Sequence, residues 1–311
     1  MSNGLHVILG TGPVGCWTAR ALRDLQIPVR AVNRTGQRPD LLPADGELIA
    51  ADASDAAQLT VAAPGAAVVY QALNPAYHEW HQHFPGLQAA ALTAATATGA
   101  RYVSIENLYM YDASKPITED SRIAPRSRKG ALRARMAAEV MAAHRRGEIR
   151  ATALRSSDYY GPGVLGSALG EMVFGNLVCG KKAQVGGSAV QPHSWAYIED
   201  VGRAAALLGT RDEALGQAWI APHAPACTQG EMVEKACRAL GIVPRITVVS
   251  PFMMRLAGLF IPAARESVEM MYEFTEPFVV DSSRMQRAFA LEPTAIDMAV
   301  ERTANWYRKR G

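Results

Sequence analysis

Three features that mark other classes of protein are missing from this chain. No apolar run approaches the ~20 residues that a membrane-spanning helix needs. The four cysteines form no Cys-x-x-Cys pair, so we expect reduced, mostly buried thiols rather than a zinc site or a disulfide framework. Basic residues are scattered, and a net charge of +3 does not indicate a nucleic-acid-binding surface. We therefore expect neither a membrane nor a nucleic acid as partner.

The beginning of the chain also lacks a leader pattern. Met-Ser-Asn-Gly runs directly into an apolar segment, without the charged region, apolar stretch and cleavage site of a signal peptide. We therefore expect a cytoplasmic location. The expected partner is a small-molecule substrate, and a homodimer with a second copy of the chain stays open.

What the chain does have is a regular alternation of short apolar runs and helical patterns. Its 311 residues, 49% of them hydrophobic, suffice for one large or two modest domains. Strand-like runs are Leu5–Leu9, Val29–Val32, Glu47–Ala50, Ala66–Tyr70, Tyr102–Ile105 and Ala151–Arg155. Helical patterns cover 14–25, 54–62, 86–98, 131–146, 200–209, 229–240, 251–260 and 296–308. This alternation predicts an α/β fold: a Rossmann-type, doubly wound parallel sheet in residues 1–160, interleaved with a smaller, mostly helical substrate lobe in residues 161–311.

The strongest motif is a glycine-rich turn directly after the first strand-like run. Gly10, Gly12 and Gly15 form a G-x-G-x-x-G pattern that includes Pro13 and Val14, and a helical pattern follows. Gly10 allows the tight turn, Gly12 leaves space for a pyrophosphate, and Gly15 lets the helix pack closely on the strand. The positive end of that helix then faces the phosphates. The order of strand, turn and helix predicts dinucleotide binding.

Five further segments accompany the glycine turn. They are Ala51–Ala53, Leu154–Gly163, Trp195–Val201, Leu291–Thr294 and Trp306-Tyr307. In their order and spacing, the chain resembles the extended short-chain dehydrogenase/reductase family, which contains nucleotide-sugar epimerases, dehydratases and aldehyde or ketone reductases. The resemblance runs almost from end to end. It implies a Rossmann-type domain that binds NAD(H) or NADP(H), with the substrate held between this domain and a C-terminal lobe.

The end of the second strand bears on the choice between the two cofactors. NAD-specific sites usually place Asp or Glu there for the ribose hydroxyls, whereas this chain has Asn33, followed by Arg34 and Arg38. A guanidinium beside an uncharged side chain suits a 2′-phosphate. We therefore predict a preference for NADP(H), with NAD(H) as the alternative; a solvated basic turn is the structural explanation of the same residues.

The resemblance also implies contacts with the rest of the cofactor. Asp52, followed by Ala53, matches the acid that contacts the adenine, although Asp52 could instead cap the next helix, as Ser54 or Asp55 could. The residues that would line the channel toward the nicotinamide are Gln71, Ala72 and Leu73.

The chemistry of the family normally uses a Tyr-x-x-x-Lys pair, in which the phenol transfers a proton and the lysine lowers its pKa and holds the nicotinamide ribose. No tyrosine occurs over residues 112–158, and matching the lysine to Lys129 puts Pro125 at the tyrosine position. The resemblance places Asn107 where a Ser or Thr usually hydrogen-bonds the substrate oxygen, and Tyr109 where related dehydratases carry a carboxylate. We predict that Asn107 polarises the substrate oxygen, Tyr109 transfers the proton and Lys129 orders the ribose. A packing role for Tyr109 is the alternative.

The substrate is predicted to be small and apolar. Family members that bind sugar nucleotides generally carry an arginine for the pyrophosphate, and this chain has His193 at the matched position. Aromatic side chains suit a hydrophobic carbonyl compound better. The candidate substrate residues are Asn74, Tyr77, Trp80, Tyr159, His193 and Trp195, with Met172 and Phe174 as further apolar candidates, of which some are expected to be core.

No metal site is predicted. Of His78, His81 and His83, only the first two share a helical face, and no carboxylate cluster accompanies them. The predicted function is an NADP(H)-dependent oxidoreductase for a small carbonyl or alcohol. The alternatives are a dinucleotide-binding sensor without catalysis, which the missing tyrosine favours, and an epimerase or dehydratase.

Overall fold

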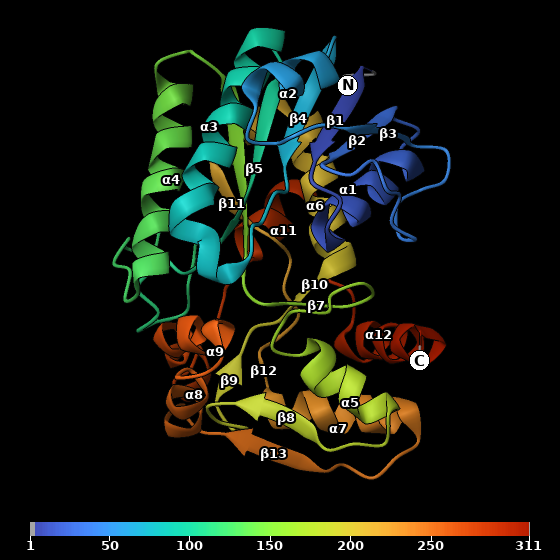
Figure 1. Ribbon diagram of the computed structural model, residues 1–311, viewed down its shortest axis with the longest axis vertical. Coiled ribbons are helices and arrows are strands. Elements are labelled where there is room, and N and C mark those ends of the chain that lie inside the picture. The colour runs from blue at the N-terminus through green and yellow to red at the C-terminus, as the bar shows by residue number, and fades with distance from the viewer. Residues whose placement is uncertain (1–3, 311) are drawn as a thin grey trace. The chain divides into compact units, whose positions relative to one another are not determined.

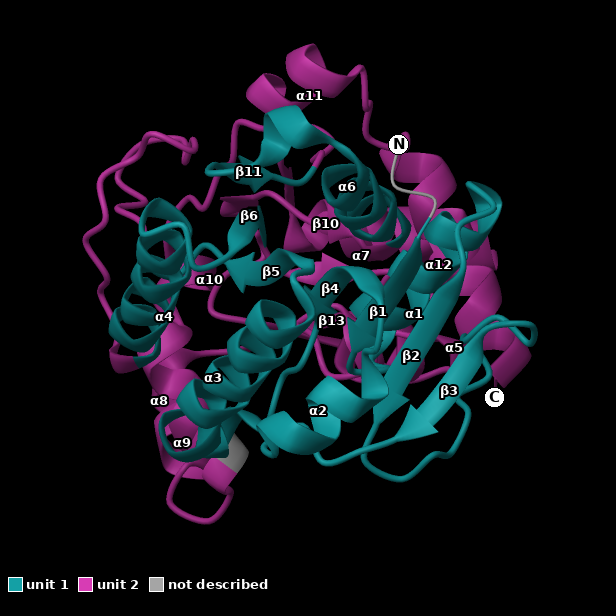
Figure 2. Cartoon of the chain, turned by 90° about the horizontal axis from the view of Figure 1, so that it is seen from above, with its two compact units in different colours: residues 1–110, 129–155, 199–221 teal, residues 111–128, 156–198, 222–311 magenta. Residues whose placement is uncertain are grey.

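The computed structural model describes residues 4–310, apart from the side chain of residue 263. The first three residues, on which the expectation about a leader rests, lie outside the described residues. The chain forms two compact units (Figure 2). Unit 1 contains the residues up to Met110 together with Lys129–Arg155 and Glu199–Ala221. Unit 2 contains Tyr111–Arg128, Ser156–Ile198 and the residues from Pro222 onward.

Unit 1 is built on a seven-stranded sheet with the order β11-β6-β5-β4-β1-β2-β3 (Figure 1). Its strands are β1 (Leu5–Leu9), β2 (Val29–Asn33), β3 (Glu47–Ala50), β4 (Ala66–Gln71), β5 (Arg101–Asn107), β6 (Arg150–Ser156) and β11 (Ala218–Ile220). The pairings of β1 with β2 and β4, of β2 with β3, of β4 with β5 and of β6 with β11 are parallel. The predicted α/β fold with a doubly wound parallel sheet is therefore confirmed.

Helices cover both faces of this sheet. They are α1 (Pro13–Asp24), α2 (Ala56–Ala62), α3 (Trp80–Thr98), α4 (Arg128–Arg145) and α6 (Ile198–Thr210), with η1 (Tyr77–Glu79) before α3 and η3 (Asp212–Ala214) after α6. Figure 2 shows α2, α3 and α4 on one face and α1 and α6 on the other. The first face is packed by alanines of α3, among them Ala91 and Ala95, against Val69 and Tyr102 of the sheet. Small side chains let this helix approach the strands closely, which explains its alanine-rich sequence.

The strand order reverses between β1 and β4, and this reversal fixes where a ligand can bind. Crossovers from β1 lead outward through β2 and β3, whereas those from β4 lead outward through β5 and β6. In open parallel sheets, ligands bind beyond the carboxyl ends of the strands at such a reversal. Gly10 follows β1 and Ala72 follows β4, so the glycine-rich turn lies at this point.

Unit 2 combines helices with three two-stranded sheets. The strand pairs are β7 (Tyr159–Tyr160) with β10 (Ala196–Tyr197), β9 (Pro192–His193) with β12 (Cys227–Thr228), and β8 (Ala183–Gly186) with β13 (Ile246–Val249). The helices are η2 (Gly170–Gly175), α5 (Asn176–Val178), α7 (Gln229–Leu240), α8 (Pro251–Ala257), α9 (Pro262–Ser267), η4 (Val268–Met270), α10 (Tyr272–Thr275), α11 (Ser283–Phe289) and α12 (Ile296–Arg310). Phe174, Trp195, Val233 and Tyr307 belong to its hydrophobic core.

Several element boundaries differ from the sequence prediction. The expected helix over 251–260 ends at Ala257, because the chain turns at Gly258, and a new helix starts with Pro262 at its first position. The expected helix over 54–62 starts at Ala56, because the Asp55 side chain accepts hydrogen bonds from two backbone N–H groups of its first turn. Within residues 4–310, no helix is long and apolar enough to cross a membrane.

Candidate cofactor and active site

The glycine-rich turn has the geometry that its sequence predicts. Gly10 has a φ of 101°, a left-handed conformation that favours glycine, and a Cβ there would lie 2.8 Å from the carbonyl oxygen of Ala72. A Cβ on Gly15 would lie 2.0 Å from the carbonyl oxygen of Gly10, so the helix and the turn touch backbone to backbone. At Gly12, by contrast, no heavy atom of the described residues other than its neighbours Thr11 and Pro13 lies within 4 Å of the position that a Cβ would take.

The amino end of α1 provides hydrogen-bond donors beside this open space. Gly12 is the cap residue and Pro13 follows it, so no side chain caps the first turn of the helix. The Val14 side chain is buried, whereas the first backbone N–H groups of α1 carry the partial positive charge of the helix dipole. Open space next to such donors is an arrangement that can accept an anion.

The end of β4 holds a buried donor. Gln71 is 1% exposed, and its Nε2 makes no hydrogen bond to the residues that the structure describes. Ala72 continues the pairing with β1 through its N–H, which donates to the Leu9 carbonyl at 2.9 Å. Leu73 packs partly against the core, and Asn74 is exposed. An unsatisfied buried amide at a strand end is a position where a ligand can supply the missing acceptor.

After β2, the two predicted arginines differ in whether their guanidinium groups already have partners in the fold. The Asn33 amide donates to Thr11 Oγ1 and to the Gln37 carbonyl, both at 2.9 Å, and so ties the β2 end to the glycine turn. Arg38 donates hydrogen bonds to the carbonyls of Pro43 and Gly46, each at 2.6 Å. Its guanidinium therefore stabilises the loop before β3. Arg34 is exposed beside this turn. Of the two arginines, Arg34 is therefore the better placed for a phosphate.

Asp52 does not cap the next helix. Its carboxylate accepts hydrogen bonds from the backbone N–H and the hydroxyl of Ser54, at 2.9 and 2.8 Å, and these bonds lower its pKa. Arg34 contributes a smaller lowering of the same pKa through its charge. Asp55 caps α2 instead, and Ala53 packs partly against the core. The Asp52 carboxylate is ionised and exposed at the end of β3.

The predicted catalytic residues of unit 1 lie around an aromatic cluster. Lys129 is fully buried at the start of α4, with its Nζ 4.7 Å from the ring centroid of Tyr77. The Tyr77 and Trp80 rings meet edge to face at 4.9 Å, and the Trp80 and Tyr109 rings are nearly parallel at 6.2 Å. The structure thus brings together Tyr77, Trp80, Tyr109 and Lys129. A buried cation among aromatic faces is stabilised by the quadrupoles of the rings.

Asn107, the last residue of β5, stands beside a buried ion pair. Glu106 accepts hydrogen bonds from Arg155 Nε at 2.8 Å and from the Ser104 hydroxyl at 3.0 Å, so β5 and β6 are linked at their carboxyl ends. The Asn107 side-chain oxygen accepts the Tyr109 N–H at 3.4 Å. These bonds fix the backbone from which both predicted catalytic side chains project.

Arg133 is a buried cation that sequence reasoning missed. It follows Lys129 by one helical turn, the same four-residue spacing as in the Tyr-x-x-x-Lys pair. Its Nη2 donates to the Ile105 carbonyl at 3.0 Å, and its guanidinium lies 4.5 Å from the Phe84 ring centroid. Arg133 therefore fastens α4 to β5 and to α3.

The predicted substrate residues of unit 2 lie close to one another. His193 in β9 is 2% exposed and its ring centroid lies 4.1 Å from that of Trp195. His193 Nε2 lies 3.0 Å from Asp158 Oδ2, and Nδ1 lies 3.1 Å from the Glu273 carbonyl. Tyr159 follows Asp158 and pairs with Ala196 in the small β7–β10 sheet.

Glu273 completes this buried polar group. Burial and, to a lesser extent, the charge of Asp158 raise the pKa of Glu273 well above its usual range. Its Oε1 makes no hydrogen bond to any described residue. Of the further apolar candidates, Phe174 is core and Met172 is exposed.

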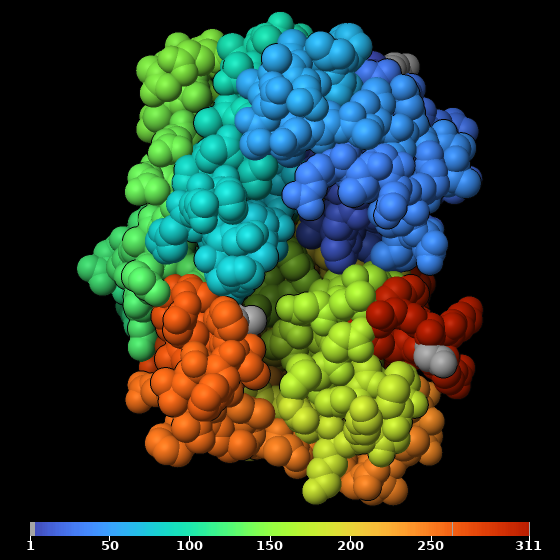
Figure 3. All heavy atoms as spheres, viewed as in Figure 1, coloured from blue at the N-terminus to red at the C-terminus, as the bar shows by residue number. Residues whose placement is uncertain are grey.

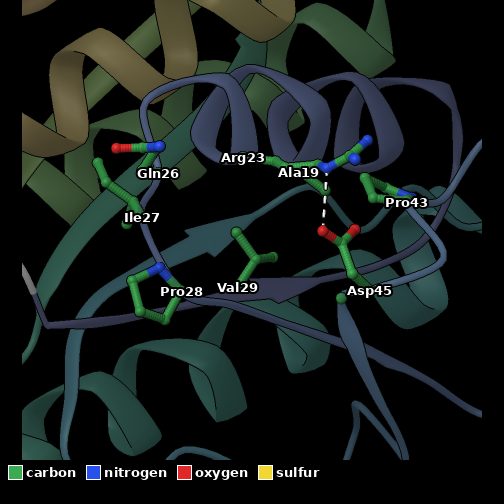
Figure 4. A pocket seen from close by; sticks show the side chains of 9 residues that line it. Ala19, Arg23, Gln26, Ile27, Pro28, Val29, Pro43 and Asp45 are labelled. Atoms are coloured by element: carbon green, nitrogen blue, oxygen red, sulfur yellow. Dashed lines mark hydrogen bonds and ion pairs between the residues drawn. The ribbon is translucent and has the colours of Figure 1, made fainter.

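A separate pocket in unit 1 lies away from these residues (Figure 4). It has a volume of about 420 Å³ and an Arg23–Asp45 ion pair of 3.0 Å on its wall. Gln26 and Val29 also line it, which places the pocket at the amino end of β2. Asn33 and the glycine turn lie at the carboxyl ends of the strands. This pocket therefore carries no part of the predicted site.

The sequence pattern of the NAD dependent epimerase/dehydratase family matches residues 7–219. This chain belongs to that family. The match covers nearly the whole of unit 1, including the glycine turn, β5 and the start of α4. A search of curated proteins gives no match.

Several solved structures share the fold of this family member. UDP-glucuronic acid 4-epimerase from Bacillus cereus, in complex with UDP-glucuronic acid and NAD, has a TM-score of 0.79 and 17% identity, over 99% of this chain and 100% of that one. The dTDP-glucose 4,6-dehydratase DesIV from Streptomyces venezuelae, with NAD bound, has a TM-score of 0.79 and 18% identity, over 98% and 97%. The epimerase Mth375 from Methanothermobacter thermautotrophicus has a TM-score of 0.82 and 15% identity, over 99% and 93%. Similarity at this identity establishes a common fold.

The described residues fit a dinucleotide at the glycine turn. The open space at Gly12 and the uncapped amino end of α1 suit a pyrophosphate, and the unsatisfied Gln71 amide adds a buried donor at the neighbouring strand end. No group of three or more His, Cys, Asp or Glu residues within 4–310 is arranged to hold a metal ion. His78 and Glu79 lie 3.9 Å apart on the exposed surface of η1.

Sequence reasoning singled out the glycine turn and missed several polar residues. The position of Arg133 could have been noticed, because it repeats the four-residue spacing of the family pair. Glu273 and Asp158 carry no such signal, since they are 115 positions apart and only the fold brings them to His193. The unsatisfied amide of Gln71 depends on its burial, which a sequence does not report.

Proposed function

We propose that this family member is an NAD(P)-dependent oxidoreductase that prefers NADP(H) and acts on a small, apolar carbonyl or alcohol. The observation that carries the proposal is the buried Lys129 in its aromatic cluster, together with the open glycine turn on the same unit. A cofactor site requires only the glycine turn. Lys129 packs against the Tyr77 ring, and Trp80 packs against both Tyr77 and Tyr109, so the buried amine and the predicted proton donor belong to one cluster.

In this proposal, three residues of unit 1 have separate roles in the reaction. A bound nicotinamide supplies or accepts the hydride. In the direction of reduction, the Asn107 amide donates a hydrogen bond to the substrate oxygen, and the Tyr109 hydroxyl gives that oxygen a proton as the carbonyl carbon becomes a carbinol carbon. Tyr109 recovers its proton from solvent. Lys129 would hold the ribose hydroxyls of a bound cofactor and so orient the ring that reacts.

His193 supports a small substrate rather than a sugar nucleotide. It lies buried between aromatic rings, and its ring nitrogens lie 3.0 Å from Asp158 and 3.1 Å from the Glu273 carbonyl. A diphosphate needs an accessible cation, usually an arginine with several donors. The rings of Trp195, Phe274 and Phe278 pack against the His193 ring, so this position offers a diphosphate no accessible cation.

An epimerase or dehydratase is the second candidate, and it is favoured by the family and by the named activities of the similar structures. The third candidate is a dinucleotide-binding sensor, favoured by the lack of tyrosine over residues 112–158. The three differ in turnover. An oxidoreductase changes the redox state of free nicotinamide, an epimerase or dehydratase returns the cofactor unchanged in each cycle, and a sensor only binds.

The test is to incubate the purified protein with NADPH or NADH and a panel of aldehydes and ketones, and to follow nicotinamide absorbance. A second panel of UDP- and dTDP-sugars is followed by chromatography. We expect NADPH oxidation with at least one apolar carbonyl compound and no conversion of sugar nucleotides. Conversion of a nucleotide sugar would replace the proposal with the second candidate, and tight NADPH binding without turnover on either panel would replace it with the sensor.

A further inference from the structure

The α8–α9 segment of unit 2 exposes a concentration of apolar side chains. Six large ones within ten residues are exposed: Phe252, Met253, Leu256, Leu259, Phe260 and Ile261. Leu259 is 73% exposed and Phe260 is 84% exposed. Val61 and Val190, by contrast, are exposed one at a time, far from each other in the sequence. Folded proteins rarely leave such a group in water without a function for it.

The backbone of this segment is held by hydrogen bonds of its own. The Ser250 hydroxyl caps α8 and accepts the Met253 N–H at 3.2 Å. The N–H groups of Phe260 and Ile261 donate to the Ala257 carbonyl at 3.1 and 2.9 Å. A Cβ on Gly258 would lie 2.9 Å from the Arg265 Cα, so the two short helices meet closely. The apolar side chains therefore project from a fixed turn.

The charges around this turn have one sign. Residues 241–265 contain Arg245, Arg255 and Arg265 and no Asp, Glu or Lys. Arg255 and Arg265 are exposed, one on each helix. The next acids along the chain, Glu266 and Glu269, have side chains only 15% and 20% exposed and lie within 4.0 Å of Arg128. The segment that carries the apolar group is therefore positively charged.

We propose that this surface, residues 252–261 with Arg255 and Arg265, docks onto an anionic bilayer surface. Exposed aromatic and aliphatic side chains enter the boundary between headgroups and acyl chains, while flanking arginines pair with anionic headgroups. The segment is orange in Figure 3, where it forms part of the visible surface of unit 2. Such docking needs no membrane-spanning helix, so it is compatible with the lack of a long apolar run in the sequence.

The test is flotation of the full chain with vesicles of phosphatidylcholine alone or enriched in phosphatidylserine. We expect binding to the anionic vesicles. The double variant Leu259→Ser/Phe260→Ser should weaken this binding at least about tenfold, because two large apolar side chains no longer enter the boundary. The matched control is Val61→Ser/Val190→Ser, two isolated exposed valines, and it should bind as the parent does.

A charge variant separates the contribution of the arginines from that of the apolar side chains. Arg255→Gln/Arg265→Gln should weaken binding to the anionic vesicles by about fivefold per arginine, whereas Arg145→Gln/Arg308→Gln, which removes two exposed arginines elsewhere, should not. Thermal melting and NAD(P) binding check that each variant is folded. Absence of vesicle binding, or equal binding by the patch and control variants, overturns the proposal. The proposal is also overturned if the parent protein is a dimer that does not bind vesicles and if the variant Leu259→Ser/Phe260→Ser is a monomer. The surface would then be an interface between two copies of the chain.

Discussion

The β1–α1 turn and the start of α4 both belong to unit 1, and they differ in what determines their geometry. At the turn, the geometry depends on the missing side chains of three glycines. Side chains at Gly10 and Gly15 would collide with backbone atoms, whereas the space beside Gly12 is open. At the start of α4, large side chains create the surroundings, with Lys129 against Tyr77 and Arg133 against Phe84.

This difference separates binding from chemistry. Backbone N–H groups and a helix dipole recognise phosphates without any particular side chain, so the glycine pattern is enough to predict a cofactor site. Proton transfer depends on one hydroxyl at one position, and a single replacement changes it. The chain keeps the first pattern and departs from the second, as the absence of tyrosine over residues 112–158 shows.

The largest effect is expected where side chains dominate. Tyr109→Phe keeps the ring that packs on Trp80 and removes only the hydroxyl. If Tyr109 transfers the proton, turnover on an accepted substrate should fall by roughly 10²–10⁴, with nearly unchanged cofactor affinity. Steady-state kinetics and NADPH titration measure the two separately.

Tyr111→Phe is the matched control for this variant. The Tyr111 hydroxyl donates to the Glu119 carbonyl at 3.3 Å, a bond within unit 2. Its loss should cost about 1 kcal/mol of stability and leave turnover unchanged. A Tyr109→Phe enzyme as fast as the parent would show that Tyr109 is a packing residue, and Lys129 or Tyr159 would become the next candidate.

A pair of glycine variants tests the glycine turn, where the backbone determines the geometry. Gly12 has φ −69° and ψ −179°, which valine adopts readily, so Gly12→Val should fold normally and lose roughly 10²-fold or more in cofactor affinity. Gly15→Val should lose stability instead, because its Cβ would lie 2.0 Å from the Gly10 carbonyl oxygen. Thermal melting and calorimetric titration distinguish the two outcomes. Undiminished NADPH affinity in Gly12→Val would mean that the phosphates bind elsewhere.

The arginines after β2 allow a smaller and more selective change. Arg34→Ala should weaken NADPH roughly 10- to 100-fold and NADH hardly at all, because one charge-assisted bond to the 2′-phosphate is lost. Arg38→Ala should lower the melting temperature with little change in this preference, since Arg38 holds the loop carbonyls of Pro43 and Gly46. Equal affinities of the parent protein for the two cofactors would remove the basis for an NADP(H) preference.

The sequence predicted the parts of this molecule that repeat a periodic or local rule. The six strand-like runs of unit 1 and the backbone geometry of the glycine turn are confirmed, because alternation and close backbone packing are visible in residue order. The short strands of unit 2 were not predicted, since two-residue strands such as β9 and β12 have no period to detect. The partners of His193 were also missed, because they depend on tertiary packing. The roles of Asn107, Tyr109 and Lys129 stay predictions.

The smallest expected effect concerns the buried group around Glu273, where side chains again dominate. Burial and the Asp158 charge raise the pKa of Glu273, so between its usual value of about 4.3 and its raised value the folded state keeps a proton that the unfolded chain has lost. The free energy of unfolding should therefore fall as pH rises through this window, by at most about 1.4 kcal/mol per pH unit. Glu273→Gln, which is neutral throughout, should remove this contribution, so its stability relative to the parent should increase with pH.

Glu276→Gln is the control with opposite sign, because a hydrogen bond from Arg126 lowers the pKa of Glu276. Urea unfolding at several pH values measures the difference, and parallel curves for the parent and Glu273→Gln would mean that folding does not raise the pKa of Glu273.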